Sequence, residues 1–231
     1  AKRYVLAHYA GLHATPFQVI PHGRDFQEMY SVGKVPTSSD PLRILFPGHL
    51  TRAKGGDIIA ELASTIPARI LEIHVLGHVA EDISLPDSVI QHGGYSRDEF
   101  VERVQAIGPH VGGVLSIWPE TFCHTLTELW SCGLPVIGLD IGAVGDRITS
   151  SGAGWVTSDM TAKGVMQLVA QAHEPDSWRL AQQRVMEWQR IARVEQRCQH
   201  MAHAYSSVYQ MVCQQRFKGL PGSQRISVTC K

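Results

Sequence analysis

Short apolar segments alternate with helical stretches along most of this chain, and this alternation limits the folds that it can adopt. Strands are predicted at 44–46, 70–76, 89–90, 114–118, 136–139 and 154–157. Helices are predicted at about 55–65, 96–107 and 125–132, with two or three more at about 161–173, at 175–201 and onward to 217. Apolar strands between amphipathic helices predict an α/β fold, in which a mainly parallel, Rossmann-like sheet is covered by helices on both faces.

The first 41 residues do not follow this alternation. Residues 1–12 have the pattern of the end of a helix, and 17–23 form a predicted short strand closed by a turn. Gly, Pro, Ser and Thr cluster at 31–41, as is typical of loops and linkers. We therefore expect a domain remnant and an interdomain linker at 1–41, a ligand-binding domain at 42–217, and a disordered tail at 218–231.

The composition excludes several classes of protein. With 44% hydrophobic and 18% charged residues, the 231-residue chain can bury a sizeable core. Its formal net charge is zero, so no overall positive field is available to hold nucleic acid. No apolar run reaches the roughly 18 residues of a membrane-spanning helix, and no secretory signal opens the chain. Five scattered cysteines without a C-x-x-C pair favour reduced thiols, so we expect a cytoplasmic protein.

Twelve histidines raise the question of a metal site. His74 and His78 span a predicted strand and its loop, where helical spacing does not apply. His200 and His203 lie on a predicted helix near the end of the chain, with only Cys198 as a nearby partner. Scattered surface histidines explain both pairs, and we predict no metal site.

A loop with glycines and cations follows the first strand of the predicted sheet. Residues 48–57 read GHLTRAKGGD, in which Arg52 and Lys54 stand just before a predicted helix. Glycines allow a backbone to approach a ligand, and cations near a helix start could bind phosphate. A plain glycine turn with two solvated cations is the structural alternative. The sequence matches neither the Walker loop nor the dinucleotide-binding fingerprint.

Two carboxylates flank the start of the helix predicted at 125–132. Glu120 follows a strand and a proline, and Glu128 lies eight positions later, roughly one turn inside the helix. A helix N-terminus offers free N–H groups to phosphate oxygens, and carboxylates accept hydrogen bonds from hydroxyl groups. The structural alternative is that an acid in the first turn only stabilises the helix dipole. The arrangement otherwise suits a polyhydroxylated, anionic ligand.

Two further loops lie at carboxyl ends of predicted strands, where open α/β sheets bind ligands. Residues 142–147 are predicted as a two-glycine turn, or as a flexible loop that closes over a bound sugar. In the loop 93–96, Tyr95 could flank a flat base.

Taken in order, these loops resemble the donor-binding half of a GT-B glycosyltransferase, in the large retaining group 1 family that includes sucrose, trehalose and mannosyl transferases. Residues 48–55 (GHLTRAKG) resemble the family's Gly-Arg-Leu-x-x-x-Lys-Gly loop, and 120–128 (ETFCHTLTE) its Glu-x7-Glu motif, with GLPVI following at 133–137. Residues 142–146 (GAVGD) resemble its Gly-Gly-x-x-Glu turn, and 20–25 (IPHGRD) its Ile-Pro-Asn-Gly-Val-Asp linker. The resemblance covers about residues 17–200.

The resemblance implies a role for each matching residue. Lys54 would contact the diphosphate of the donor, Glu120 the hydroxyls of the transferred sugar, and Glu128 the ribose hydroxyls. Backbone amides around 122–125 would lie on the phosphates. Lys54 and Glu120 are then the expected catalytic residues. The expected donor-binding residues are Gly48, His49, Arg52, Lys54, Tyr95, Glu120, Phe122, Cys123, His124, Thr125 and Glu128. The family needs no metal as a rule, so no cofactor is expected.

The chain also departs from the family pattern. His49 stands where the family has arginine, so Arg52 is expected to substitute or phosphate affinity to be lower. Asp146 is one methylene shorter than the family's glutamate. The family's N-terminal acceptor domain is not in this chain, so we expect the fragment to bind donor but to be inactive alone.

The resemblance implies transfer of a hexose from a nucleoside-diphosphate sugar to a glycan or lipid-linked acceptor, in bacterial surface-polysaccharide assembly. The full-length enzyme would work in the cytoplasm, with peripheral association at the inner face of the membrane, and without nucleic acid. Two alternatives stay open: a non-catalytic module of the same architecture that serves protein interaction, and a sugar-nucleotide epimerase.

Overall fold

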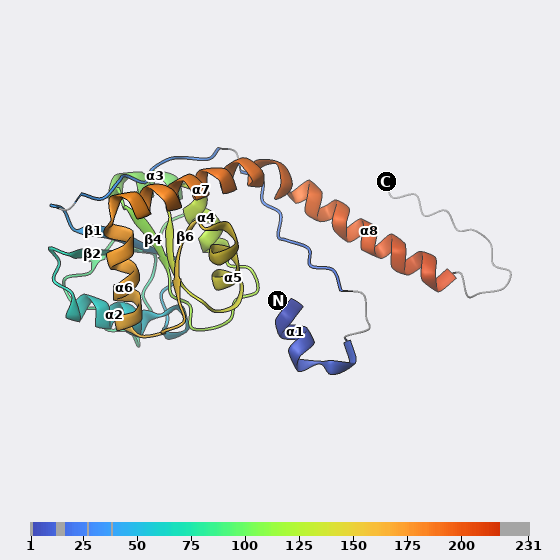
Figure 1. Ribbon diagram of the computed structural model, residues 1–231, viewed down its shortest axis with the longest axis horizontal. Helices are drawn as coiled ribbons and strands as arrows, with labels where there is room; N and C mark the ends of the chain where they lie inside the picture. Colours follow the sequence, from blue (N-terminus) through green and yellow to red (C-terminus); the bar gives the residue numbers. More distant parts are fainter. Residues whose placement is uncertain (1, 13–16, 27, 38, 218–231) are drawn as a thin grey trace.

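A computed structural model describes residues 2–12, 17–26, 28–37 and 39–217 of the chain (Figure 1). Six parallel strands form one sheet in the order β3-β2-β1-β4-β5-β6. The strands are β1 (Leu42–Pro47), β2 (Leu71–Leu76), β3 (Ile90–Gln91), β4 (Val111–Val114), β5 (Val136–Leu139) and β6 (Gly154–Thr157). The prediction of a Rossmann-like, parallel α/β sheet is confirmed. The predicted tail at 218–231 lies outside the described residues.

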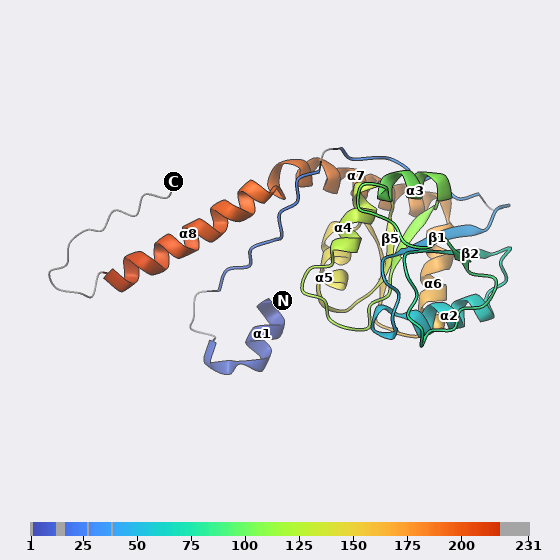
Figure 2. The same ribbon diagram turned by 180° about the vertical axis from the view of Figure 1, so that it is seen from behind.

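Helices cover both faces of the sheet, because side chains of successive strand residues point to opposite faces and both sets are apolar. One buried cluster joins the strands to α2 (Gly56–Thr65) and α6 (Ala162–His173). The other joins them to α3 (Phe100–Ile107), α4 (His124–Ser131) and α5 (Gly142–Ser151). The long helix α7 (Pro175–Glu195) contributes Trp178 to the first cluster and Trp188 to the second. Figures 1 and 2 show the sheet from its two sides.

The N-terminal segment packs against the domain without joining its sheet. After α1 (Lys2–His8) and the short helix η1 (Ala10–Leu12), the strand predicted at 17–23 does not form. A strand needs a partner along its length, whereas this segment bonds to the α7–α8 junction through Arg24, whose N–H donates to the Gln196 carbonyl at 2.7 Å. Farther on, the Tyr30 and Val32 N–H groups each donate at 2.8 Å to carbonyls at the end of α4.

The C-terminal helices break where the sequence predicted continuity. The helix predicted at 175–201 ends at Glu195, and α8 (Cys198–Phe217) starts after a two-residue break. Figures 1 and 2 show α8 extending away from the sheet domain. Among the described residues, no helix combines the length and apolarity needed to cross a bilayer.

The strand predicted at 114–118 was misplaced. β4 occupies Val111–Val114, and the following residues leave the sheet. The start of this strand was not predicted because it contains Gly112 and Gly113, and glycine is depleted in strands. Packing requires them, because an added Cβ would lie 2.6 Å from Leu129 at Gly112 and 2.1 Å from Phe46 at Gly113. Side chains from neighbouring elements thus fill the space above these two positions.

The turn predicted at 142–147 was also wrong, because Gly142 begins the helix α5. Its apolar side is formed by Ala143, Val144 and Ile148, which are all buried. At the other predicted helix start, Ser96 and Glu99 exchange the expected hydrogen bonds, at 2.8 and 3.4 Å, but they close a turn that precedes α3. The helix itself starts at Phe100.

Candidate functional site

The strand order places a ligand site between β1 and β4. From β1 the chain proceeds outward to β2 and β3, and then returns to β4 on the other side of β1. The loops after β1 and β4 therefore run in opposite directions and leave a crevice at the carboxyl end of the sheet. A cavity of about 60 Å³ lies there, lined by Phe46, Pro47, Gly48, His49, Leu50, Lys54, Gly113, Val114, Leu115, Ser116, Glu120, Cys123 and Thr125.

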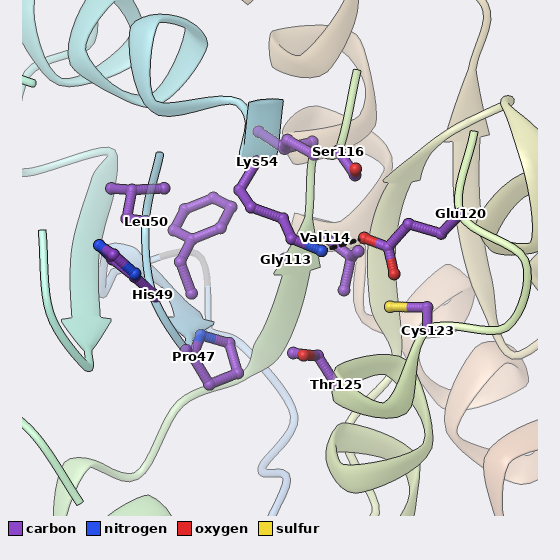
Figure 3. Close-up of a pocket in the computed structure, with 13 residues that line it drawn as sticks. Pro47, His49, Leu50, Lys54, Gly113, Val114, Ser116, Glu120, Cys123 and Thr125 are labelled. Atoms are coloured by element: carbon purple, nitrogen blue, oxygen red, sulfur yellow. Dashed lines mark hydrogen bonds and ion pairs between the residues drawn. The ribbon is translucent and has the colours of Figure 1, made fainter. Parts of the chain in front are cut away.

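Lys54 reaches Glu120 across this cavity (Figure 3). Its Nζ donates to Glu120 Oε1, so the two predicted catalytic residues, 66 positions apart, form an ion pair. The short helix η2 (Arg52–Lys54) positions the lysine, and the Thr51 hydroxyl accepts from the Lys54 N–H at 3.3 Å. A loop cation and a carboxylate thus converge where the resemblance requires them.

Glu120 is held by the start of α5. Its carbonyl accepts from the Ala143 N–H at 2.8 Å. Gly142 allows this close approach, because an added Cβ would lie 2.8 Å from Pro119 and 2.9 Å from the Glu120 backbone, and its φ is +57°. Burial acts to raise the pKa of the Glu120 carboxyl, but the hydrogen bond and charge of Lys54, with Cys123 and Ser116, hold that pKa below its ordinary value. The carboxylate is therefore ionised and can accept hydrogen bonds from hydroxyl groups.

The first turn of α4 lies at the same cavity. Thr125, in that turn, lines the cavity beside Cys123, the residue before the helix. No side chain caps this helix start. N–H groups of a first helical turn have no partner within the helix and attract anions. This arrangement is suited to phosphate oxygens.

A partly buried arginine fixes the loop that leads into α4. Arg147 Nη1 donates to the Phe122 and Cys123 carbonyls at 2.8 and 3.0 Å, and Nη2 donates to Thr127 Oγ1 at 2.8 Å. Burial lowers the pKa of its guanidinium to about 10, so the group stays charged at neutral pH. These contacts support Cys123 in a left-handed conformation, with φ of 69°, which is unusual for a residue with a side chain. Burial, followed by the charge of Glu120, raises the pKa of the Cys123 thiol to about 12.

A second, wider hollow of about 300 Å³ adjoins the first and shares Gly48 and His49 with it. It is lined by Gly48, His49, Gly77, His78, Gly94, Tyr95, Arg97 and Glu128. Burial, followed by the charge of Glu128, raises the pKa of the Tyr95 hydroxyl to about 12. Because the two hollows share a wall, one elongated ligand can lie along both.

Most of the predicted site residues are brought together, and three are not. Gly48, His49, Lys54, Tyr95, Glu120, Cys123, Thr125 and Glu128 line the two hollows. Arg52 pairs with Asp82 at 3.0 Å on the exposed surface and lines neither hollow. The Phe122 ring packs between His22, at 4.9 Å, and His124, at 5.0 Å.

Arg24 and Arg147 also contact the site, and neither was predicted from the sequence. Arg24 Nη1 donates to Glu128 Oε1 at 2.8 Å, from a segment expected to be only a linker. Both arginines form hydrogen bonds with residues far away in the sequence. No local sequence pattern identifies such partners.

His74 and His78 lie in different surroundings. His74 bonds to Glu72 at 2.7 Å and to His92 at 2.9 Å, whereas His78 lines the second hollow. Within residues 2–12, 17–26, 28–37 and 39–217, no cluster of three or more metal-ligating side chains was found.

The sheet and its crevice define a Rossmann-like α/β domain, with the crevice at the switch point of strand order, where open α/β sheets bind ligands. The chain belongs to the family described as "Glycosyl transferases group 1", whose model matches residues 32–183. This match includes every element that lines the two hollows. No curated protein matches the chain.

Solved structures with the same fold are glycosyltransferases. Sucrose-phosphate synthase from Thermosynechococcus elongatus is 17% identical, with a TM-score of 0.68 over 92% of this chain and 56% of that one. HepE of Anabaena, solved with UDP-glucose, is 16% identical, with a TM-score of 0.59 over 73% and 49%. The pneumococcal O-GlcNAc transferase GtfA, solved with UDP and GlcNAc, is 16% identical, with a TM-score of 0.60 over 92% and 44%. The chain spans about half the length of these neighbours, and its fold is that of one GT-B half.

Proposed function

We propose that this chain is the donor-binding domain of a retaining glycosyltransferase that uses a nucleoside-diphosphate hexose. The observation that carries the proposal is the meeting of Lys54 and Glu120 in one cavity, beside the N-terminus of α4. The UDP and UDP-sugar complexes of similarly folded proteins support a nucleotide sugar as the ligand.

In this proposal the diphosphate lies between Lys54 and the first turn of α4. Negative charge develops on the leaving phosphate as the glycosidic bond breaks, and the lysine cation and the helix N-terminus stabilise that charge. The reaction then needs no metal ion. Lys54 gives up its contact with Glu120 to the phosphate, and the freed carboxylate accepts hydroxyls of the transferred sugar.

Glu128 lies in the adjoining hollow and holds the ribose hydroxyls in this proposal. Tyr95 shares that hollow, so the base lies beside it. Transfer requires a second domain that brings a glycan or a lipid-linked acceptor to the sugar. We place the full enzyme in the cytoplasm, at the inner face of the membrane, in surface-polysaccharide assembly.

The test is donor binding by this chain and its variants, measured by calorimetry with UDP, UDP-glucose and GDP-mannose. Lys54→Ala and Glu128→Ala should each weaken binding of the cognate ligand about tenfold or more, since each removes a charged hydrogen bond worth about 1.5–3 kcal/mol. Arg52→Ala is the matched control, because it removes a cation two positions away that points out of the site. Its affinity should equal that of the unmodified chain.

Two results would reject the proposal in different ways. Unchanged affinity in both the Lys54 and the Glu128 variants would reject the site. Absence of binding to a broad panel of nucleotide sugars would favour a non-catalytic interaction module. An epimerase would be recognised by conversion of the nucleotide sugar in the absence of any acceptor.

A further inference from the structure

Glu120 also lines a third hollow, which Lys54 does not line. Its volume is about 580 Å³, and Glu120 lines both this hollow and the cavity described above. The other lining residues are Val5, Ala7, Trp118, Pro119, Thr121, Asp140, Ile141, Gly142 and Asp146. A ligand here would therefore be a direct neighbour of the sugar that Glu120 is proposed to hold.

Trp118 stands at this hollow and is 69% exposed. Large aromatic side chains stabilise a fold or an interface most when their apolar area is buried. A tryptophan exposed to solvent therefore needs an explanation. Ile117 beside it is 45% exposed.

The backbone that carries Trp118 is fixed, although its ring is exposed. The buried Ser116 hydroxyl donates to the Trp118 carbonyl at 3.1 Å, and the Ile117 N–H donates to the Ala53 carbonyl at 3.0 Å. Pro119 restricts the residue before it, which is Trp118, and disfavours a helical conformation there. The ring is thus held out on a rigid support, as a binding platform requires.

The charges of the hollow indicate the kind of ligand. Glu120, Asp140 and Asp146 supply carboxylates, whereas its described lining residues include no lysine or arginine. Without lysine or arginine such a surface offers phosphate no cation, whereas carboxylates accept hydrogen bonds from hydroxyl groups. A pyranose ring has hydroxyls at its rim and C–H groups on its faces, which pack on the electron-rich face of an aromatic ring.

We propose that this hollow, with Trp118 as its stacking platform, binds an uncharged sugar ring of the acceptor. The inference rests on the proposed function, because the acceptor role depends on a donor sugar at Glu120. It adds that this domain itself supplies part of the acceptor site. It also places any phosphate of the acceptor outside this hollow.

The test follows the indole N–H signal of Trp118 in ¹H–¹⁵N NMR spectra of the chain, identified by its disappearance in Trp118→Phe. The probes are methyl α-D-glucoside, methyl α-D-galactoside, methyl α-L-rhamnoside and glucose 6-phosphate. At least one methyl glycoside should shift the signal, with weak affinity, and glucose 6-phosphate should bind less well than methyl glucoside. Trp118→Ala should weaken glycoside binding about tenfold, because it removes the apolar surface on which the C–H face of the sugar packs.

Tyr209→Ala is the control, since Tyr209 is an aromatic residue of equal exposure, 68%, on the distant helix α8. It should change neither glycoside nor UDP affinity, and Trp118→Ala should leave UDP affinity unchanged. Normal UDP binding without any glycoside-induced shift would overturn this inference and leave the proposed function standing. Loss of both kinds of binding would overturn both. Glycoside binding without any nucleotide-sugar binding would overturn the acceptor role.

Discussion

Arg24 and Glu128 form an ion pair across 104 positions of sequence, with 2.8 Å between Nη1 and Oε1 and side chains only 22% and 13% exposed. The arginine comes from the segment that precedes the sheet, and its backbone is tied to the α7–α8 junction. The proposed ribose-binding carboxylate is therefore oriented by a residue outside the sheet domain. The pair also leaves Glu128 a second oxygen for a ligand.

Replacing Arg24 should weaken nucleotide binding through Glu128. In Arg24→Ala we expect UDP affinity to fall by about fivefold to tenfold, since a hydrogen bond to a charged group contributes about 1 kcal/mol or more. Arg24→Lys should recover part of the loss, because it keeps the charge but not the forked geometry. Calorimetry measures both. Tighter UDP binding in Arg24→Ala would mean that the arginine competes with the ribose instead.

Gly142→Ala should disturb Glu120 without touching the ligand. The added Cβ meets backbone atoms of Pro119 and Glu120, and the φ of +57° is strained for alanine. We expect affinity for UDP-glucose to fall more than affinity for UDP, since Glu120 is proposed to contact only the sugar.

Gly152→Ala is the control for backbone strain alone. Its φ is +67°, but the nearest atom to an added Cβ is a flexible Arg184 side-chain atom at 3.4 Å. Gly152→Ala should lose about 1–2 kcal/mol of stability from its backbone conformation, Gly142→Ala should lose more because of the backbone contacts, and only Gly142→Ala should discriminate between the two ligands. An equal loss for UDP and UDP-glucose would contradict the role of α5 in positioning Glu120.

Arg147→Gln should loosen the loop before α4. It removes a charged donor from two carbonyls and a hydroxyl in a partly buried setting, so we expect the free energy of unfolding to fall by about 2–4 kcal/mol. UDP affinity should fall with it, because the phosphates are proposed to lie on the amides of this turn. Urea unfolding and calorimetry test both effects. Arg184→Gln, which breaks an exposed pair with Glu187, should change neither.

His110 should make the domain less stable in mild acid. Burial, with Arg43 nearby, lowers the pKa of its imidazole to about 4, and its Nδ1 accepts from the Arg43 N–H at 2.8 Å. Because the folded-state pKa lies below the unfolded value of about 6.5, the unfolded chain binds the extra proton first. The stabilising effect is complete above about pH 6.5 and is lost as the pH falls toward 4.

The comparison is with His110→Asn, whose side-chain oxygen can accept the same hydrogen bond. Between about pH 7 and about pH 5, the unmodified chain should lose about 2 kcal/mol more unfolding free energy than the variant. Urea unfolding at the two pH values gives the difference. Equal losses in both proteins would show that His110 does not titrate in this way.

Much of the site was predictable because its motif residues stand at element ends. Lys54 follows β1, and Glu120 and Glu128 flank the start of α4, so the strand order alone brings their backbones to one edge of the sheet. The direction of each side chain was not predictable. Arg52 and Lys54 have the same charge and lie two positions apart, yet one pairs with Asp82 outside and the other with Glu120 inside.

The amino-acid sequence by itself determined the kind of fold, because alternating apolar strands and amphipathic helices bury their apolar sides only in a covered parallel sheet. It also determined which loops carry cations and carboxylates. Only the tertiary structure decided where β4 and α5 begin. Gly112, Gly113 and Gly142 occupy positions where residues distant in the sequence leave no room for a side chain. Only the tertiary structure brought Arg24 to Glu128 and placed the exposed Trp118 at the same hollow as Glu120. Local propensity acts over a few residues, whereas these contacts depend on how the whole chain packs.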